Sequence, residues 1–202
     1  MEKLKTSPAY LLQSVEIQTI EQEQLNRVFE FLRTRDTTKQ DNLDKIGAID
    51  IARTLQFLGC RPTRADVDLI IWEVDDDLDG FVSKQEFETM YKRCISDPLD
   101  LEPRQLYNLV TFLMYDKDFK GRVTIEETLQ ILFVRHGRKN LDDEIKAIFG
   151  EEQRDRDTSE EPSITYSEYV NKITRRALAK QEVMMKKKMD KLMGKGEDSE
   201  LH

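Results

Sequence analysis

The sequence predicts an all-α fold built from repeated helix–loop–helix units. An acidic loop at 75–86 lies between two amphipathic helical patterns. Apolar residues suited to a short strand recur in similar contexts, separated by 33, 41 and 41 residues, at Ile49, Val82, Val123 and Ile164. Repetition at such a period indicates reuse of one supersecondary unit. We therefore expect four units, with short strand pairing between neighbouring loops.

The loop at 75–86 carries oxygen donors at the spacing of a twelve-residue calcium site. Ca²⁺ takes about six to eight oxygen ligands, and donors at alternate positions can converge on one ion. Gly80 stands at the sixth position, where a sharp turn favours a positive φ. Ser83, at the ninth, can act through a water. The predicted metal ligands are Asp75, Asp77, Asp79, the Phe81 carbonyl and Glu86.

An acidic solvated turn is the alternative interpretation of this loop, since Asp and Gly favour turns. It does not explain a glutamate at the twelfth position or helical patterns on both sides. The flanking apolar residues follow i, i+3, i+4, i+7 spacing, at Val67, Ile70, Ile71 and Val74 before the loop and at Phe87, Met90, Tyr91 and Cys94 after it. The calcium interpretation accounts for all three features.

With this loop and a weaker copy at 116–127, the chain resembles the EF-hand superfamily of calmodulin, troponin C and centrin, as a divergent four-hand member. The resemblance extends over most of residues 21–174. It implies an all-α EF-hand fold with two lobes of paired helix–loop–helix units and short loop-to-loop strand pairing. It also implies Ca²⁺ as the bound ion and an amphipathic helix of another protein as the partner.

Capping signals and prolines suggest the boundaries of these parts. Thr19 and Gln22 form a capping box, and prolines at 98 and 103 disfavour helix just before them. Residues 1–18 are interpreted either as a frayed tail or as a contact helix starting near Pro8. The expected parts are a preamble at 1–18, a first lobe at 19–96, a linker at 97–103, a second lobe at 104–174 and a basic helical tail at 175–202.

The first and third hands depart from the calcium pattern. In the first, taking Ile49 as the counterpart of Val82 puts Arg53 at the twelfth position, where a cation repels Ca²⁺. In the third, Lys120 stands at the fifth position of the 116–127 loop, where an oxygen belongs. We expect an ion-free first hand and a third hand that is weak or empty.

The fourth hand also departs from the pattern. Counting back from Glu168 places Asp157, Ser159 and Glu161 at positions one, three and five, but Pro162 at position six. Proline fixes φ near −65° and cannot make the positive-φ turn. We expect a structural hand here.

Composition and charge limit the partners. The net charge is −8 at pH 7, so we expect no nucleic-acid binding by the acidic body. No apolar run has the length of a membrane span, and no signal-peptide pattern opens the chain. Cys60 and Cys94 lack ligand spacing and are interpreted as reduced thiols. We expect an intracellular protein of the cytoplasm or cytoskeleton, including the axoneme of a cilium or flagellum.

A basic helical segment follows the hands. Residues 171–195 contain nine Lys or Arg and two acidic residues, with an apolar stripe at Leu178, Met185, Met189 and Leu192. A solvated helix of good propensity is one interpretation. The other is a docking arm for an acidic surface or a partner helix.

Three classes of function were compared. The leading prediction is a calcium-responsive regulator that binds a helical target in a larger complex. The alternative is a constitutive light-chain-like subunit of a cytoskeletal or axonemal assembly, with little calcium switching. An enzyme is not expected, because His136 and His202 are the only histidines and no phosphate loop, nucleophile elbow or zinc spacing occurs.

Overall fold

The computed structural model describes residues 8–33, 44–97, 100–150 and 162–193. Within them the fold is all-α apart from one small sheet, as predicted. The elements are α1 (Pro8–Leu32), α2 (Ala48–Phe57), α3 (Arg64–Trp72), α4 (Lys84–Ile95), α5 (Gln105–Tyr115), β1 (Arg122–Thr124), α6 (Ile125–Phe149), β2 (Ser163–Thr165) and α7 (Tyr166–Met193).

Neighbouring loops pair as the repeat predicted. β1 and β2 are antiparallel, with Val123 opposite Ile164. In the first half the partner of Val82 is Ile46, whose backbone exchanges hydrogen bonds of 2.9 and 2.8 Å with it. The prediction that Ile49 is the counterpart of Val82 is wrong, because Ile49 lies in the first turn of α2 and is 65% exposed. Ile46 is fully buried. Since the bridge to Val82 lies in the core, this position requires an apolar side chain.

Two helices differ in extent from the sequence pattern. α1 is continuous from Pro8, so the capping box at Thr19 does not start a helix. α6 contains the helix leaving the third hand and the one entering the fourth. They meet at Gly137, whose φ of 68° is non-helical and bends the chain.

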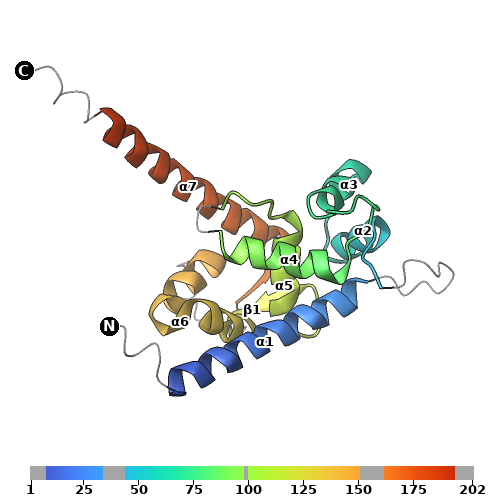
Figure 1. The fold of residues 1–202 in the computed structure, drawn as a ribbon, viewed down its shortest axis with the longest axis horizontal. Coiled ribbons are helices and arrows are strands. Elements are labelled where there is room, and N and C mark those ends of the chain that lie inside the picture. Colours follow the sequence, from blue (N-terminus) through green and yellow to red (C-terminus); the bar gives the residue numbers. More distant parts are fainter. Residues whose placement is uncertain (1–7, 34–43, 98–99, 151–161, 194–202) are drawn as a thin grey trace, which may run out of the picture.

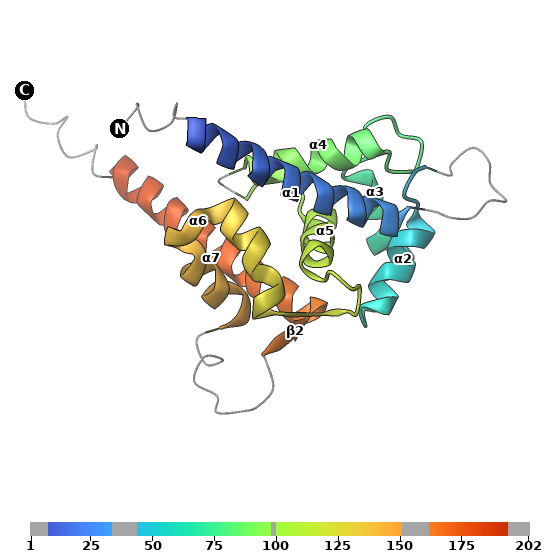
Figure 2. The ribbon, with the colours of Figure 1, turned by 90° about the horizontal axis from the view of Figure 1, so that it is seen from below.

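The core lies around α5, which contacts α1, α3, α4, α6 and α7. Its inward residues are almost completely buried: Leu106, Leu109, Val110, Phe112, Leu113 and Met114. Figures 1 and 2 show α1 running across the body, beside elements of both halves. Contacts between α1 and α2, α4, α5 and α6 join these halves through one continuous apolar core.

Arg27 of α1 fastens the first half to the third loop. Its guanidinium donates hydrogen bonds to backbone carbonyls at the end of α5 and the start of the loop, at Leu113, Met114, Asp116 and Lys117. It also lies 4.5 Å from the centroid of the Phe119 ring, which stacks on Phe31. A cation near the C-terminus of a helix offsets its partial negative charge.

A second polar tie joins α1, α4 and α6. Arg135 of α6 donates a 2.8 Å hydrogen bond from Nε to the Glu21 carboxylate and another to the Tyr91 hydroxyl. Tyr91 also donates to Glu21. Only 9% of the Arg135 side chain and 18% of the Glu21 side chain are exposed, so screening by solvent is weak.

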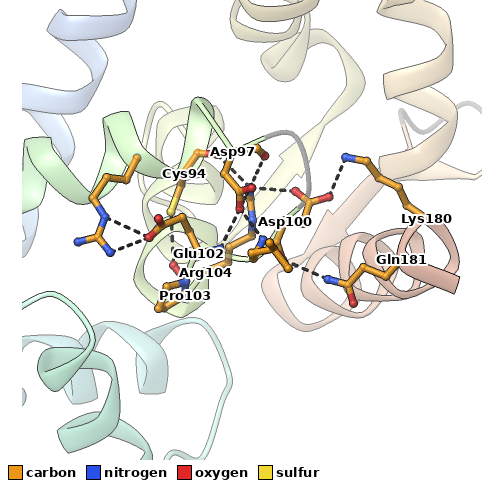
Figure 3. A network of polar contacts seen from close by, with 10 residues as sticks. Cys94, Asp97, Asp100, Glu102, Pro103, Arg104, Lys180 and Gln181 are labelled. Atoms are coloured by element: carbon orange, nitrogen blue, oxygen red, sulfur yellow. Dashed lines mark hydrogen bonds and ion pairs between the residues drawn. The ribbon is translucent and has the colours of Figure 1, made fainter. Parts of the chain in front are cut away.

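The segment between α4 and α5 is fastened to α7 (Figure 3). Arg104 lies 2.8 Å from the Asp100 carboxylate and donates to the Cys94 carbonyl. Asp100 is also 3.0 Å from Lys180 Nζ, and its carbonyl accepts from Gln181. This network fixes the direction in which α7 leaves the body.

The C-terminal part of α7 extends past the rest of the body (Figure 1). Its exposed apolar residues include Val183, Met184, Met185 and Met189. None of the helices in the described ranges combines the length and hydrophobicity needed to cross a membrane.

Candidate metal site

The acidic loop is held between α3 and α4 by local capping. Ser83 is the N-cap of α4, and its hydroxyl accepts from the Glu86 amide at 3.3 Å. The Glu86 carboxylate in turn accepts from the Ser83 amide at 2.8 Å and the hydroxyl at 2.7 Å. This capping box fixes Glu86 in the first turn of α4, facing the loop.

The loop backbone folds around the carboxylate of Asp75. Leu78 and Gly80 adopt positive φ values of 58° and 82°. This turn directs the amides of Asp79 and Gly80 toward Asp75, which accepts from them at 3.2 and 2.8 Å. Gly80 meets the expectation of a positive φ at the sixth position. A leucine with positive φ is uncommon, so the loop sustains local strain at Leu78.

Three predicted ligands converge. Carboxylate oxygens of Asp75, Asp77 and Glu86 all lie within 4.8 Å of one another, the one such acidic group among the described residues. Glu86 also accepts from the amides of Asp76 and Asp77 at 2.9 and 3.3 Å, which draws it across the loop. The oxygen-only donor set fits a hard cation such as Ca²⁺ and lacks the nitrogen or sulfur ligands typical of zinc.

Asp79 lies outside this group and pairs with a lysine of the neighbouring hand. One of its oxygens accepts from the Phe81 amide at 2.9 Å, and the other pairs with the ammonium of Lys45. Lys45 Nζ is also 3.8 Å from an Asp77 oxygen. The Phe81 carbonyl, the remaining predicted ligand, stays a prediction from its place at the seventh position.

The ionisation of the site follows from these contacts. The hydrogen bond from Lys45 lowers the pKa of Asp79 below its ordinary value and raises the pKa of Lys45. Desolvation raises the pKa of Asp77. Burial opposes the charge of Glu86, but its hydrogen bonds from Ser83, Asp77 and Asp76 outweigh this and lower its pKa. The carboxylates of Asp79 and Glu86 are therefore ionised at neutral pH.

The third loop has the same backbone shape. Phe119 and Gly121 adopt φ values of 51° and 82°, at the positions of Leu78 and Gly80. Asp116 accepts from the amides of Lys120 and Gly121 at 2.9 and 2.6 Å, as Asp75 does in the acidic loop. The Lys120 ammonium lies 2.7 Å from Glu127 and so neutralises the twelfth position.

The first and fourth hands differ more. Counting from Ile46, the twelfth position of the first hand is Asp50, so its expected assignment to Arg53 is wrong. Asp50 is buried and accepts from the Gly47 amide at 2.9 Å, as a cap of α2. In the fourth hand, Pro162 directly precedes β2 and belongs to no helix or strand, whereas Asp157, Ser159 and Glu161 lie outside the described residues. Glu168 caps Thr165.

Lys45 is the site residue that the sequence reasoning missed. It directly precedes Ile46 and thus lies beside the bridge to Val82. The signal was present in the pattern: had Ile46 been aligned with Val82, Lys45 would have stood at the position of Phe81, next to the neighbouring loop.

Comparisons with known proteins bear on the family. The chain is 27% identical over 110 residues to "Probable calcium-binding protein CML27" of Arabidopsis thaliana, covering 54% of this chain and 56% of that protein. It is 31% identical over 88 residues to "Calcium-binding allergen Ole e 8" of Olea europaea, covering 44% and 51%. These similarities support an EF-hand, calmodulin-like family.

The chain spans about half the length of the curated relatives that it matches. No family model matches it. Both relatives are named for calcium binding, and the acidic group in the 75–86 loop is suited to the same ion.

Proposed function

We propose that the protein is a non-catalytic, calcium-responsive EF-hand protein that binds a helical segment of another protein. The observation that supports this best is the convergence of Asp75, Asp77 and Glu86 in one loop. Bound Ca²⁺ would supply a divalent charge held by these oxygens together with Asp79 and the Phe81 carbonyl. The proposed ligands lie on both sides of the loop, so their convergence links the end of α3 to the first turn of α4.

A shift of Glu86 on ion binding would be transmitted to the core through α4. Glu86 belongs to the first turn of α4, which contacts α1 and α5. Phe87 beside it is buried and packs edge-on against Phe29 of α1, with ring centroids 5.2 Å apart. A shift of the α4 start would therefore repack the α1–α4 contact, the kind of two-state element that calcium sensors use.

The partner site that we propose is a cavity of about 480 Å³ between α5, α6 and α7. Its lining combines apolar residues with charged ones, among them Tyr107 and Ile173 beside Arg135, Glu144 and Arg176. Such a lining offers contacts both to the apolar face of an amphipathic helix and to its charged edge. Thr111 belongs to the wall of this cavity, and its buried hydroxyl has no hydrogen-bond partner among the described residues.

The second candidate is a constitutive, light-chain-like subunit of a cytoskeletal or axonemal assembly. Two features favour it. Lys120 forms an ion pair with Glu127 in the third loop. Hydrogen bonds from Arg27 and Arg135 join the two halves of the protein. A fixed subunit needs no calcium-driven opening. We propose a location in the cytoplasm or cytoskeleton for either function.

The calcium site is tested by Glu86→Gln. This change removes one charge and the two-oxygen anionic grip, yet glutamine still completes a capping box. Loss of a hydrogen-bonded charge pair costs about 2–5 kcal/mol, so we expect calcium affinity by calorimetry to fall about 30-fold or more. Glu182→Gln makes the same change on α7 and should leave binding intact. High-affinity binding by E86Q would contradict the assignment.

Partner capture separates the two candidates. The wild-type protein and E86Q serve as baits for the same extract, with Ca²⁺ or with a chelator. A regulator retains its partner differently in the two conditions, and E86Q removes the difference. A fixed subunit retains the same partner in all four combinations of bait and condition.

A further inference from the structure

The lysine beside the acidic loop comes from the other hand of the pair. Lys45 lies two residues before Gly47, the N-cap of α2. Its neighbour Ile46 is joined to Val82 by two backbone hydrogen bonds. Ile46 and Val82 are both fully buried. The ammonium is therefore tethered to the loop by a rigid, solvent-free bridge.

The contact occupies an oxygen that the predicted ion needs. Asp79 has two carboxylate oxygens: one accepts from the Phe81 amide and the other pairs with Lys45. Each carboxylate oxygen has two lone pairs, so the hydrogen bond from the Phe81 amide can persist while Asp79 binds the ion. The ammonium differs from the amide, because its full positive charge on the same carboxylate opposes a second cation there.

Charge favours the same conclusion. Lys45 Nζ pairs with Asp79 and is 3.8 Å from Asp77, one of the three converging carboxylates. In the absence of a divalent ion, the ammonium offsets repulsion among these acids. Once Ca²⁺ binds, a positive charge at this distance is repelled by it.

We propose that Lys45 is a tethered internal competitor for the ion at the 75–86 loop: it stabilises the calcium-free loop and is displaced when Ca²⁺ binds. The inference rests on the proposed function of that loop. The first hand thus supplies a cation to the loop of its neighbour. Lys120 has the corresponding role within its own loop, where it pairs with Glu127.

The test compares Lys45→Gln with Lys84→Gln in the full chain. Both variants remove one positive charge near the loop. Lys84 is exposed at the start of α4 and, among the described residues, makes no ion pair with the loop carboxylates. Calorimetric titration with CaCl₂ should show K45Q binding about two- to five-fold tighter than wild type, the range of a partly exposed ion pair. K84Q should change less, since only screened long-range charge acts.

Thermal unfolding supplies a second, independent measurement. K45Q should lower the Tm of the calcium-free protein, whereas with saturating Ca²⁺ its Tm should equal that of wild type, because Lys45 is already displaced. The two effects are linked: the stability lost without Ca²⁺ must match the affinity gained.

Equal affinities of K45Q and K84Q, or weaker binding by K45Q, would overturn the role of Lys45 while leaving the calcium site in place. No Ca²⁺ binding by wild type and K45Q alike would overturn the proposed function, and this inference with it. Binding by K45Q alone would support both.

Discussion

Lys120 Nζ lies 2.7 Å from Glu127 Oε1, so the fifth and twelfth positions of the third loop neutralise each other. The backbone around them has the shape of the acidic loop, with positive φ at Phe119 and Gly121. Lys120 at the fifth position is therefore a side-chain difference from the acidic loop on a backbone of the same shape.

Lys120→Asp should convert the third loop into a second site. The change supplies an oxygen ligand and shifts the local charge by two units, so we expect affinity there to rise at least about ten-fold. Calorimetry should show one additional ion bound per chain. Lys117→Asp makes the same charge change at the second position, outside the ligand set, and should add no site. Unchanged stoichiometry in K120D would place the fault in the loop geometry.

The tie between Glu21 and Arg135 predicts a cost to stability. Glu21→Gln leaves the guanidinium of Arg135 largely buried beside a neutral group. Removing one partner of a hydrogen-bonded, desolvated pair costs about 2–5 kcal/mol, so the free energy of unfolding in urea should fall by about that amount. The α1–α6 contact would weaken with it.

The matched control is Glu30→Gln on the same helix, since Glu30 pairs with Arg33 near the surface and 52% of its side chain is exposed. A surface pair contributes about 0–1 kcal/mol. Equal losses in E21Q and E30Q would mean that the buried tie does not hold the halves together.

Glu144 and Arg176 predict a pH dependence at the α6–α7 contact. Burial opposes ionisation of Glu144, but the bidentate hydrogen bonds from Arg176 outweigh it and lower the pKa. A lowered folded-state pKa gives stability that is present above the unfolded value, 4.5, and is lost as the pH falls through the folded value.

Arg176→Met should therefore destabilise the protein at pH 7 and matter less as the pH falls through the lowered folded-state pKa of Glu144, because the protonated carboxyl no longer attracts the guanidinium. We expect a difference of about 0.5–1 kcal/mol at pH 7, because half of the Arg176 side chain is exposed. Thermal unfolding of both proteins at pH 7 and pH 3.5 measures it. A gap that persists at pH 3.5 would assign the effect to packing of the arginine stem.

The sequence was sufficient where one rule decides a position. The 75–86 loop has its turn glycine, its capping box and its converging acids in the predicted places, and Val123 pairs with Ile164. It was insufficient where two residues fit one rule. Ile46 and Ile49 are both β-branched and flank the start of α2, and only burial against Val82 distinguishes them.

Contacts made by tertiary packing were also beyond local patterns. Neither spacing nor periodicity indicates that Arg27 reaches the end of α5. This contact depends on the angle between α1 and α5, which lie far apart in the sequence, whereas the contact of Lys45 with Asp79 depends on which isoleucine pairs with Val82.

The last prediction concerns the helical arm, here residues 183–193 of α7. We propose that it holds the protein on an acidic, cytoskeletal surface. Lys180 and Gln181 contact Asp100, and Arg176 contacts Glu144, so a cut after Thr174 would also damage the body. Truncation after Glu182 keeps these contacts. The shortened protein should bind Ca²⁺ as before and should sediment with polymerised tubulin far less than the full chain.

Two multiple variants separate the forces in this arm. Replacing Lys186, Lys187 and Lys188 by Gln removes charge, whereas replacing Met185 and Met189 by Gln removes exposed apolar surface. Screening shortens from about 8 Å at physiological salt to about 3 Å at 1 M, so the lysine variant should lose binding mainly at low salt. The methionine variant should lose it at both, because apolar burial is not screened. Undiminished sedimentation of the truncated protein would show that the arm is a solvated helix.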